Sequence, residues 1–267
     1  MSDDDSSIAS WESCVDSFAV LCESLRVKDP SVTVVSRTDI RRTLPLTNQH
    51  ARRLGKSLRG NPHVTELQLR ICRLVEEENV DEDNDSIAHL LRFIRNSRAL
   101  LKVCLAGETF YPDRPHVPPS ILRRFFLALA ENTAIKVLVL WYLRLQPGGF
   151  DVLMKKTQSL KTLFVESCHF ASVVARDNMA EAVGENQSLE RLEIKIGSVD
   201  FIEPVLLRLG SHPRLRELRL QWFHYDQRPS HMEALACALR SSNTLELLEL
   251  GGCAFNKDKV EHLLEGI

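Results

Sequence analysis

The sequence predicts an α/β fold, a right-handed solenoid with a parallel sheet on its concave face, helices on its convex face and an N-terminal capping helix. Two observations lead to this prediction. A short phrase of the form apolar-x-x-apolar-x-apolar, usually preceded by a polar stretch containing Asn, recurs seven times in the 267 residues. The segments between the phrases are each long enough for one helix. A strand–helix unit cannot bury its own apolar face, but stacked units share one continuous core.

All 21 apolar positions of the phrase hold Leu, Ile or Val. They are Val64, Leu67, Leu69; Leu100, Val103, Leu105; Ile135, Leu138, Leu140; Leu160, Leu163, Val165; Leu189, Leu192, Ile194; Leu215, Leu218, Leu220; and Leu245, Leu248, Leu250. Hydrophobic residues make up 44% of the chain, so chance would fill 21 chosen positions with odds on the order of 10⁻⁸. Successive phrases begin 36, 35, 25, 29, 26 and 30 residues apart, which suits one strand and one helix per repeat.

This pattern resembles the leucine-rich repeat family, in its ribonuclease-inhibitor-like subclass with long, helix-containing repeats. The resemblance covers the chain from about residue 32 to its C-terminus. It implies a horseshoe-shaped fold and says little about function, because the subclass includes enzyme inhibitors, GTPase-activating proteins, actin regulators and arms of innate-immune sensors.

The chain divides into three parts. Residues 1–9 are acidic and Ser-rich, and we expect a disordered tail. Residues 10–30 are expected to form the capping helix over the open core of the first repeat, with Ser10 as N-cap. Its apolar face consists of Trp11, Val15, Phe18, Cys22 and Leu25. Residues 31–267 form the repeat domain, in which residues 32–35 could add an irregular strand that we do not count.

The first helix inside the repeats is predicted over 48–59, and each later segment carries its own apolar stripe. Ser230 and Glu233 form a candidate capping box at the start of the last of these helices. The stripes are Ala51, Leu54, Leu58; Ile87, Leu90, Leu91, Ile94; Leu122, Phe125, Leu129; Met179, Ala182, Val183; Val205, Leu206, Leu209; and Met232, Leu235, Leu239.

Two insertions lengthen the early repeats. Seven of the ten residues in 76–85 are acidic, which is typical of a solvated loop. The spacing of Asp81, Asp83 and Asp85 is like the start of an EF-hand calcium loop. However, Ser86 and Arg92 stand where that loop needs Gly and Glu, so we predict no calcium site. The segment 107–120 contains four prolines and should form a stiff loop at the edge of the horseshoe, either a spacer or a binding loop.

Composition and motif content disfavour several classes of function. Lys and Arg number 34 against 36 Asp and Glu, a formal net charge of −2, so bulk charge does not favour nucleic acid. Seven cysteines without a C-x-x-C pair indicate reduced thiols inside the cell, in the cytoplasm or nucleus. Cys72, Cys168 and Cys253 share one position after their strands and are expected to pack there. With no catalytic motif and no long apolar span, we expect a monomer that is not an enzyme, binds no cofactor, metal or membrane, and has another protein as its partner.

In each strand the residues that alternate with the buried ones should point to the concave face. The repeat register arranges them in three columns. The first column is Glu66, Lys102, Val137, Thr162, Arg191, Glu217, Leu247; the second is Gln68, Cys104, Val139, Phe164, Glu193, Arg219, Glu249; the third is Arg70, Ala106, Trp141, Glu166, Lys195, Gln221, Gly251.

The candidate partner site lies in the middle of these columns. Oppositely charged neighbours, Arg191 with Glu217, Glu193 with Arg219 and Glu249, and Glu166 with Lys195, should pair within the chain. The apolar residues Val137, Val139, Trp141 and Phe164 have no such partner and predict a hydrophobic anchor for a protein–protein contact. The predicted rim is Lys102, Glu166, Arg191, Glu193, Lys195 and Arg219, with Trp222 as an extension.

Three alternatives stay open at this point. The proline-rich insertion could fold over the apolar residues and bury them within the monomer. The protein could regulate an enzyme, as the GTPase-activating members of the related family do, although no motif of theirs can be placed on this sequence. It could also be a purely structural or degenerate fragment.

Overall fold

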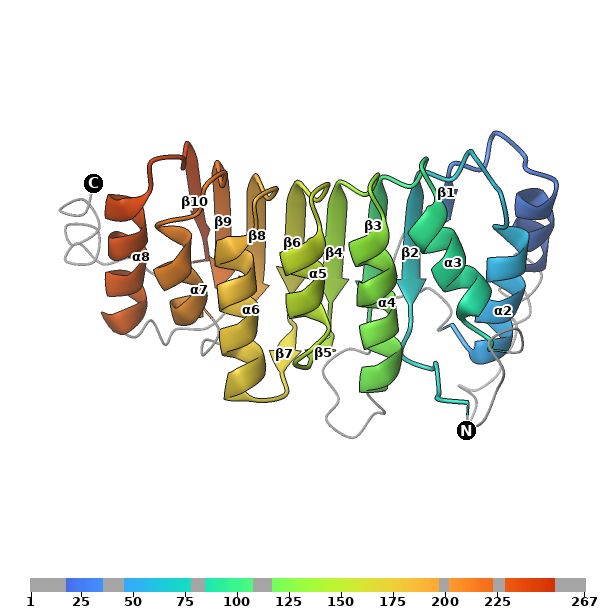
Figure 1. The fold of residues 1–267 in the computed structure, drawn as a ribbon, viewed down its shortest axis with the longest axis horizontal. Helices are drawn as coiled ribbons and strands as arrows, with labels where there is room; N and C mark the ends of the chain where they lie inside the picture. Colours follow the sequence, from blue (N-terminus) through green and yellow to red (C-terminus); the bar gives the residue numbers. More distant parts are fainter. Residues whose placement is uncertain are drawn as a thin grey trace, which may run out of the picture.

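The protein is a row of parallel strands with a row of helices along one side (Figure 1). This computed structural model describes residues 18–35, 46–77, 85–107, 117–196, 202–222 and 229–252. The main sheet has eight strands in the order β1-β2-β3-β4-β6-β8-β9-β10, which is their order in the chain. The strands are β1 (Val34–Val35), β2 (Glu66–Arg70), β3 (Lys102–Ala106), β4 (Val137–Trp141), β6 (Thr162–Glu166), β8 (Arg191–Ile196), β9 (Glu217–Trp222) and β10 (Leu247–Gly251).

Each pair of neighbouring main-sheet strands is connected through the helical side, as the solenoid prediction requires. The helices are α2 (Asn48–Ser57), α3 (Ala88–Asn96), α4 (Pro119–Glu131), α5 (Phe150–Lys156), α6 (Val173–Glu185), α7 (Ile202–Leu209) and α8 (Pro229–Ser241). The sequence did not predict α5, because seven residues are too few for a clear apolar stripe. The predicted N-cap Ser230 lies inside α8, which begins one residue earlier, at Pro229, since proline suits the first turn of a helix.

The predicted phrase supplies the core. In the first six repeats every phrase residue is at most 3% exposed, while Leu245, Leu248 and Leu250 of the seventh are partly exposed. On the helical side, Phe126 and Phe150 meet edge to face with ring centroids 5.6 Å apart. The fold is thus an α/β solenoid of the leucine-rich-repeat type.

A polar residue stands three positions before each phrase, and it is buried in five of the seven repeats, as Asn61, Asn132, Thr157, Asn186 and His212. The side-chain oxygen of Asn132 accepts from the backbone N–H groups of Ala134 and Ile135. Its amide donates to the carbonyls of Ile94 and Ser97, at 2.6 and 2.8 Å. These carbonyls belong to the end of α3 and the turn that follows it, so the asparagine satisfies groups that the helix leaves unpaired.

The same position is used in other repeats with small changes. Asn61 donates to the carbonyl of Leu25, and Asn186 donates to that of Met154 at 2.6 Å. In the sixth repeat the position is His212, whose Nδ1 accepts from the N–H groups of Arg214 and Leu215. The His212 side chain is buried and interacts with the backbone of Val183 in the previous helix. Burial lowers the pKa of this imidazole to about 4.

The N-terminal end matches the capping prediction where it is described. Residues 18–26 are helical, Cys22 and Leu25 are buried, and the ring of Phe18 lies 4.9 Å from that of His50 in α2. The strand that we did not count is present as β1, in which Val34 pairs with Glu66. Its partner strand fixes the register that its own short sequence leaves ambiguous.

The turns after β3, β4 and β6 begin at equivalent positions of their repeats. Gly107, Tyr142 and Ser167 directly follow β3, β4 and β6; the last two have positive φ, 53° and 50°. Beyond two of these turns, β5 (Arg144–Leu145) and β7 (His169–Phe170) pair in a small second sheet.

Of the three cysteines predicted to pack in these turns, Cys72 is buried and Cys168 is half-buried. Burial raises the pKa of the Cys168 thiol to about 12. The third, Cys253, and residues 78–84 and 108–116 of the insertions lie outside the described residues.

No described helix is long and apolar enough to cross a membrane. Within the described ranges, no three His, Cys, Asp or Glu side chains gather in a way that could hold a metal ion.

Candidate interaction face

The three predicted columns lie on the side of the sheet away from the helices, which we call the open face. The strand register confirms each column: Lys102 pairs with Val137, Val137 with Thr162 and Thr162 with Arg191. The register continues unbroken from β2 to β10. This follows from the repeat, because the phrase residues of every strand must enter one core, which leaves the alternate residues on the opposite face.

Two aromatic rings form the centre of the open face. Trp141 and Phe164 are diagonal neighbours on β4 and β6 and pack edge to face, with centroids 6.2 Å apart and planes at 85°. The ammonium of Lys195 lies 4.9 Å from the Phe164 centroid, a distance at which the ring attracts a cation. The sequence predicted both aromatic positions, but not that the two rings would contact each other.

The predicted apolar anchor is only partly accessible. Val137, Trp141 and Phe164 are half-buried. Val139 is 7% exposed, so the prediction that it contributes accessible surface is wrong. It lies in register with Phe164 and two residues from both Val137 and Trp141, and larger neighbours in a sheet take contact area from a small side chain between them. The remaining three residues, Val137, Trp141 and Phe164, are here called the aromatic cluster.

The indole N–H of Trp141 is buried and has no hydrogen-bond acceptor among the described residues. A buried donor without an acceptor costs about 1–3 kcal/mol, and interfaces favour Trp because its ring provides contact area and its N–H can bind a polar partner.

Next to the cluster, Cys104 is fully buried, and burial raises the pKa of its thiol to about 12. The thiolate is therefore negligible at neutral pH, and this side of the cluster is apolar in character.

A chain of ion pairs borders the cluster on its C-terminal side. Arg191 contacts Glu193 at 3.1 Å and Glu217 at 3.6 Å. Arg219 contacts Glu217 at 3.6 Å and Glu249 at 3.1 Å. Alternating charges on β8, β9 and β10 thus hold one another in place, as the sequence predicted for Arg191 with Glu217 and for Arg219 with Glu249.

Two predicted pairs are replaced by other contacts. Lys195 reaches Glu193 on its own strand at 3.7 Å and Phe164 across the sheet, and it does not pair with Glu166. Glu193 contacts Arg191 and Lys195, and not Arg219. Residues two apart on one strand share a face, so contacts along a strand compete with those across it. Among the described residues Glu166 makes no ion pair.

The N-terminal side of the cluster is bordered by a smaller polar group. Lys102 contacts Glu66 at 2.9 Å, and Gln68 donates to the same carboxylate at 2.6 Å. The hydrogen bond that Lys102 donates to Glu66 raises the pKa of Lys102. Burial alone would raise the pKa of Glu66, but the bonds from Gln68 and Lys102 outweigh it and lower that pKa. Of the predicted site only the Trp222 side chain lies outside the described residues.

Comparison with known proteins gives fold neighbours and no family assignment. No protein-family model matches the chain, and no curated protein matches it. Similar solved structures include actin-binding site 2 of leiomodin-1, with 18% identity over 57% of this chain and 88% of that chain and a TM-score of 0.42. Another is the C-terminal domain of tropomodulin from Caenorhabditis elegans, with 14% identity over 60% and 93% and a TM-score of 0.38. Likenesses this distant indicate nothing about what this chain binds.

Proposed function

We propose that the chain is a non-catalytic protein-binding module whose open face holds a partner protein at the aromatic cluster. The observation that carries this proposal is the pair Trp141 and Phe164, packed edge to face and half-buried on the open face. Aromatic side chains at the centre of a surface, surrounded by polar residues, are the usual anchors of protein–protein contacts.

The polar surroundings support the same function. Arg191 and Arg219 are each held by two carboxylates, so their positions are set before a partner arrives and little side-chain freedom is lost on binding. The carboxylate of Glu166, which makes no ion pair with a described residue, offers an acceptor beside the rings.

The experiment compares affinity capture from a cell extract by three forms of the chain: the unchanged protein, the double variant Trp141→Ala/Phe164→Ala, and the control Val173→Ala/Val174→Ala. The control valines begin α6 on the helical side and are 62% and 59% exposed, so they remove exposed apolar surface elsewhere. We expect one set of proteins to be captured by the unchanged chain and the control and lost by the aromatic variant.

A thermal melt of each form, recorded by circular dichroism, confirms folding before capture. Loss of about 2 kcal/mol or more per aromatic anchor is usual for such sites, which corresponds to at least about a thirtyfold weaker complex. Equal capture by the aromatic variant and the control would contradict the proposal.

The proposal includes the setting in which the module works. We place the protein in the cytoplasm or nucleus as a monomer, and within the ribonuclease-inhibitor-like subclass of its fold. The support for an intracellular setting is that Cys22, Cys72, Cys104, Cys168 and Cys237 all carry free thiols, as reducing compartments maintain.

A further inference from the structure

A pocket of about 600 Å³ lies between α2 and α3, on the helical side of the second repeat. Its charged lining is entirely basic: Arg59, Arg92, Arg98 and His89. The ammonium of Lys28 adds a further cation beside Gly60, 3.8 Å from the point that a Cβ of this glycine would occupy. Among the described residues no aspartate or glutamate lines the pocket, although the chain as a whole carries a net charge of −2.

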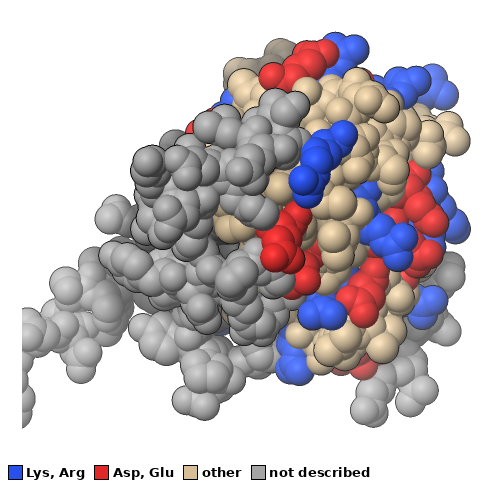
Figure 2. Space-filling view, turned by 90° about the vertical axis from the view of Figure 1, so that its left-hand side faces the viewer, with Lys and Arg blue, Asp and Glu red and all other residues tan. Residues whose placement is uncertain are grey.

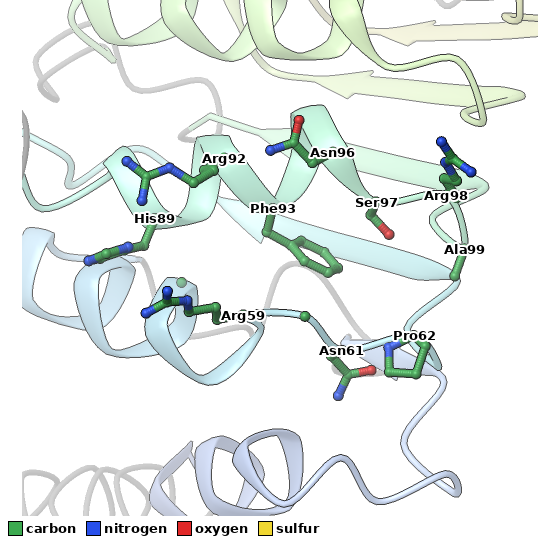
Figure 3. A pocket seen from close by; sticks show the side chains of 12 residues that line it. Arg59, Asn61, Pro62, His89, Arg92, Phe93, Asn96, Ser97, Arg98 and Ala99 are labelled. Atoms are coloured by element: carbon green, nitrogen blue, oxygen red, sulfur yellow. The ribbon is translucent and has the colours of Figure 1, made fainter.

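The basic residues surround an apolar floor. Arg59, Arg92 and His89 lie toward one end of the pocket and Arg98 toward the other, with the ring of Phe93 between them (Figure 3). Pro62 and Ala99 complete the apolar lining near Arg98. The cations therefore do not converge on one point; they flank an apolar surface.

Elsewhere on the helical side, several basic residues lie beside acidic ones. The pocket of about 410 Å³ between α6 and α7 combines Arg176 and Arg208 with Asp177 and Glu203. At the end of the stack where α8 lies, basic and acidic side chains are interspersed over the described surface (Figure 2).

Ion pairs also form between neighbouring helices. Arg95 of α3 contacts Glu131 of α4 at 2.7 Å, and Lys155 of α5 contacts Glu181 and Glu185 of α6. By contrast, Arg59, Arg92 and Arg98 make no ion pair with any described residue. Basic residues near helix C-termini are favoured by the helix dipole, which explains one cation per helix and not the absence of every acid from the lining.

We propose that this pocket binds an acidic segment of a partner protein in which two carboxylates flank an apolar side chain. The carboxylates would be held by Arg98 at one end and by Arg59 and Arg92 at the other. The apolar side chain would lie against Pro62 and Ala99, because Phe93 is only 7% exposed. Guanidinium groups bind carboxylates through paired hydrogen bonds, and a pocket of this volume suits a few residues of extended chain. A single phosphate would need the arginines at one point, and nucleic acid would need a basic track beyond one pocket.

The test measures fluorescence anisotropy of a short labelled peptide with two glutamates flanking a leucine, titrated with the purified full chain at low salt. Companion probes replace both glutamates by glutamine, replace them by one phosphoserine, or replace the peptide by a short oligothymidine. The variant is Arg59→Gln/Arg98→Gln. The control is Arg144→Gln/Arg240→Gln, which removes the same charge from exposed positions on β5 and α8.

We expect the acidic peptide to bind the unchanged chain and the control equally, and the pocket variant to bind at least about tenfold more weakly. The Trp141→Ala/Phe164→Ala variant should bind the peptide normally, which separates this site from the open face. The proposal is overturned by an absence of saturable binding, by equal binding of the glutamine probe, or by an equal loss in the control. Tighter binding of the phosphoserine probe or of the oligothymidine would also overturn it, in favour of a phosphate or nucleic-acid site.

Discussion

At the scale of single residues, an asparagine three positions before a phrase links its repeat to the previous one, as Asn61, Asn132 and Asn186 do. The sequence shows Asn recurring near this position but gives no reason for it. The structure supplies the reason, because Asn132 and Asn186 satisfy backbone groups of their own turn and of the previous repeat at once. That double role depends on how repeats stack, which a single strand–helix unit does not reveal.

Replacing Asn132 by alanine should lower the free energy of unfolding by about 3 kcal/mol, because it leaves buried N–H and carbonyl groups without partners. Urea unfolding followed by circular dichroism measures this. Asn96→Ala is the matched control, since Asn96 is exposed at the end of α3, and should change stability by less than about 0.5 kcal/mol. Similar losses of stability in the two variants would show that the hydrogen bonds of Asn132 do not stabilise the contact between repeats.

His212 makes stability depend on pH. Burial lowers its pKa from 6.5 to about 4, so below about pH 6.5 the unfolded chain binds a proton that the folded chain does not. Stability should fall as the pH drops from about 6.5 to 4, with this residue contributing a loss of about 2 kcal/mol at pH 5.

The variant His212→Asn keeps an acceptor for the N–H groups of Arg214 and Leu215 and does not titrate. Its unfolding free energy, measured in urea between pH 7 and 5, should decline less than that of the unchanged chain by that amount. An identical decline in both proteins would mean that other groups cause the acid sensitivity.

At the scale of elements, sequence prediction succeeded where the repeat phrase imposed a period and failed where it did not. All seven phrase strands and the three columns of the open face follow from one alternation, in which phrase residues face the core and the residues between them face the opposite side of the sheet. The short elements β1, α5, β5 and β7 have too few residues to carry that signal, and they are held in place by contacts with neighbouring elements. The contacts of Lys195 with Glu193 and Phe164 were missed for a related reason. The strand register identifies which residues are neighbours, but the length and conformation of the side chains decide which neighbours are in contact.

Gly55 sets the approach of α2 to α3. A Cβ at this position would lie 2.4 Å from the backbone nitrogen of Leu90 and 2.9 Å from the backbone carbon of His89. These atoms belong to the backbone, so α3 would have to shift as a whole. Gly55→Ala should therefore destabilise the chain by about 1–3 kcal/mol, although alanine is the better helix former.

The control for this prediction is Lys56→Ala, an exposed position on the same helix, where the expected change is within about 0.5 kcal/mol. Thermal melts of the two variants provide the comparison. A stabilised Gly55→Ala variant would show that the helices do not pack as closely as described.

At the scale of the whole molecule, the two faces of the solenoid differ in what they offer a partner. The open face carries an aromatic pair bordered by ion pairs, and the helical side of the second repeat carries a basic pocket. The composition predicted neither feature, because a net charge near zero does not show where charges of one sign are grouped on the surface. The columns predicted the position of the aromatic pair, and the pocket depends on how two helices approach each other, which their separate stripes do not determine.

The central claim, that a partner protein binds on the open face, is tested most directly by site-specific photo-crosslinking. A photoreactive amino acid is placed at Thr162, which lies between Val137 and Arg191 in the first column, and separately at Leu207, exposed on α7 of the helical side. The protein that the unchanged chain and the Val173→Ala/Val174→Ala control capture, and the aromatic variant does not, should crosslink from position 162 and not from 207. Crosslinking of that protein from 207 alone would contradict the claim and place the interface on the helices.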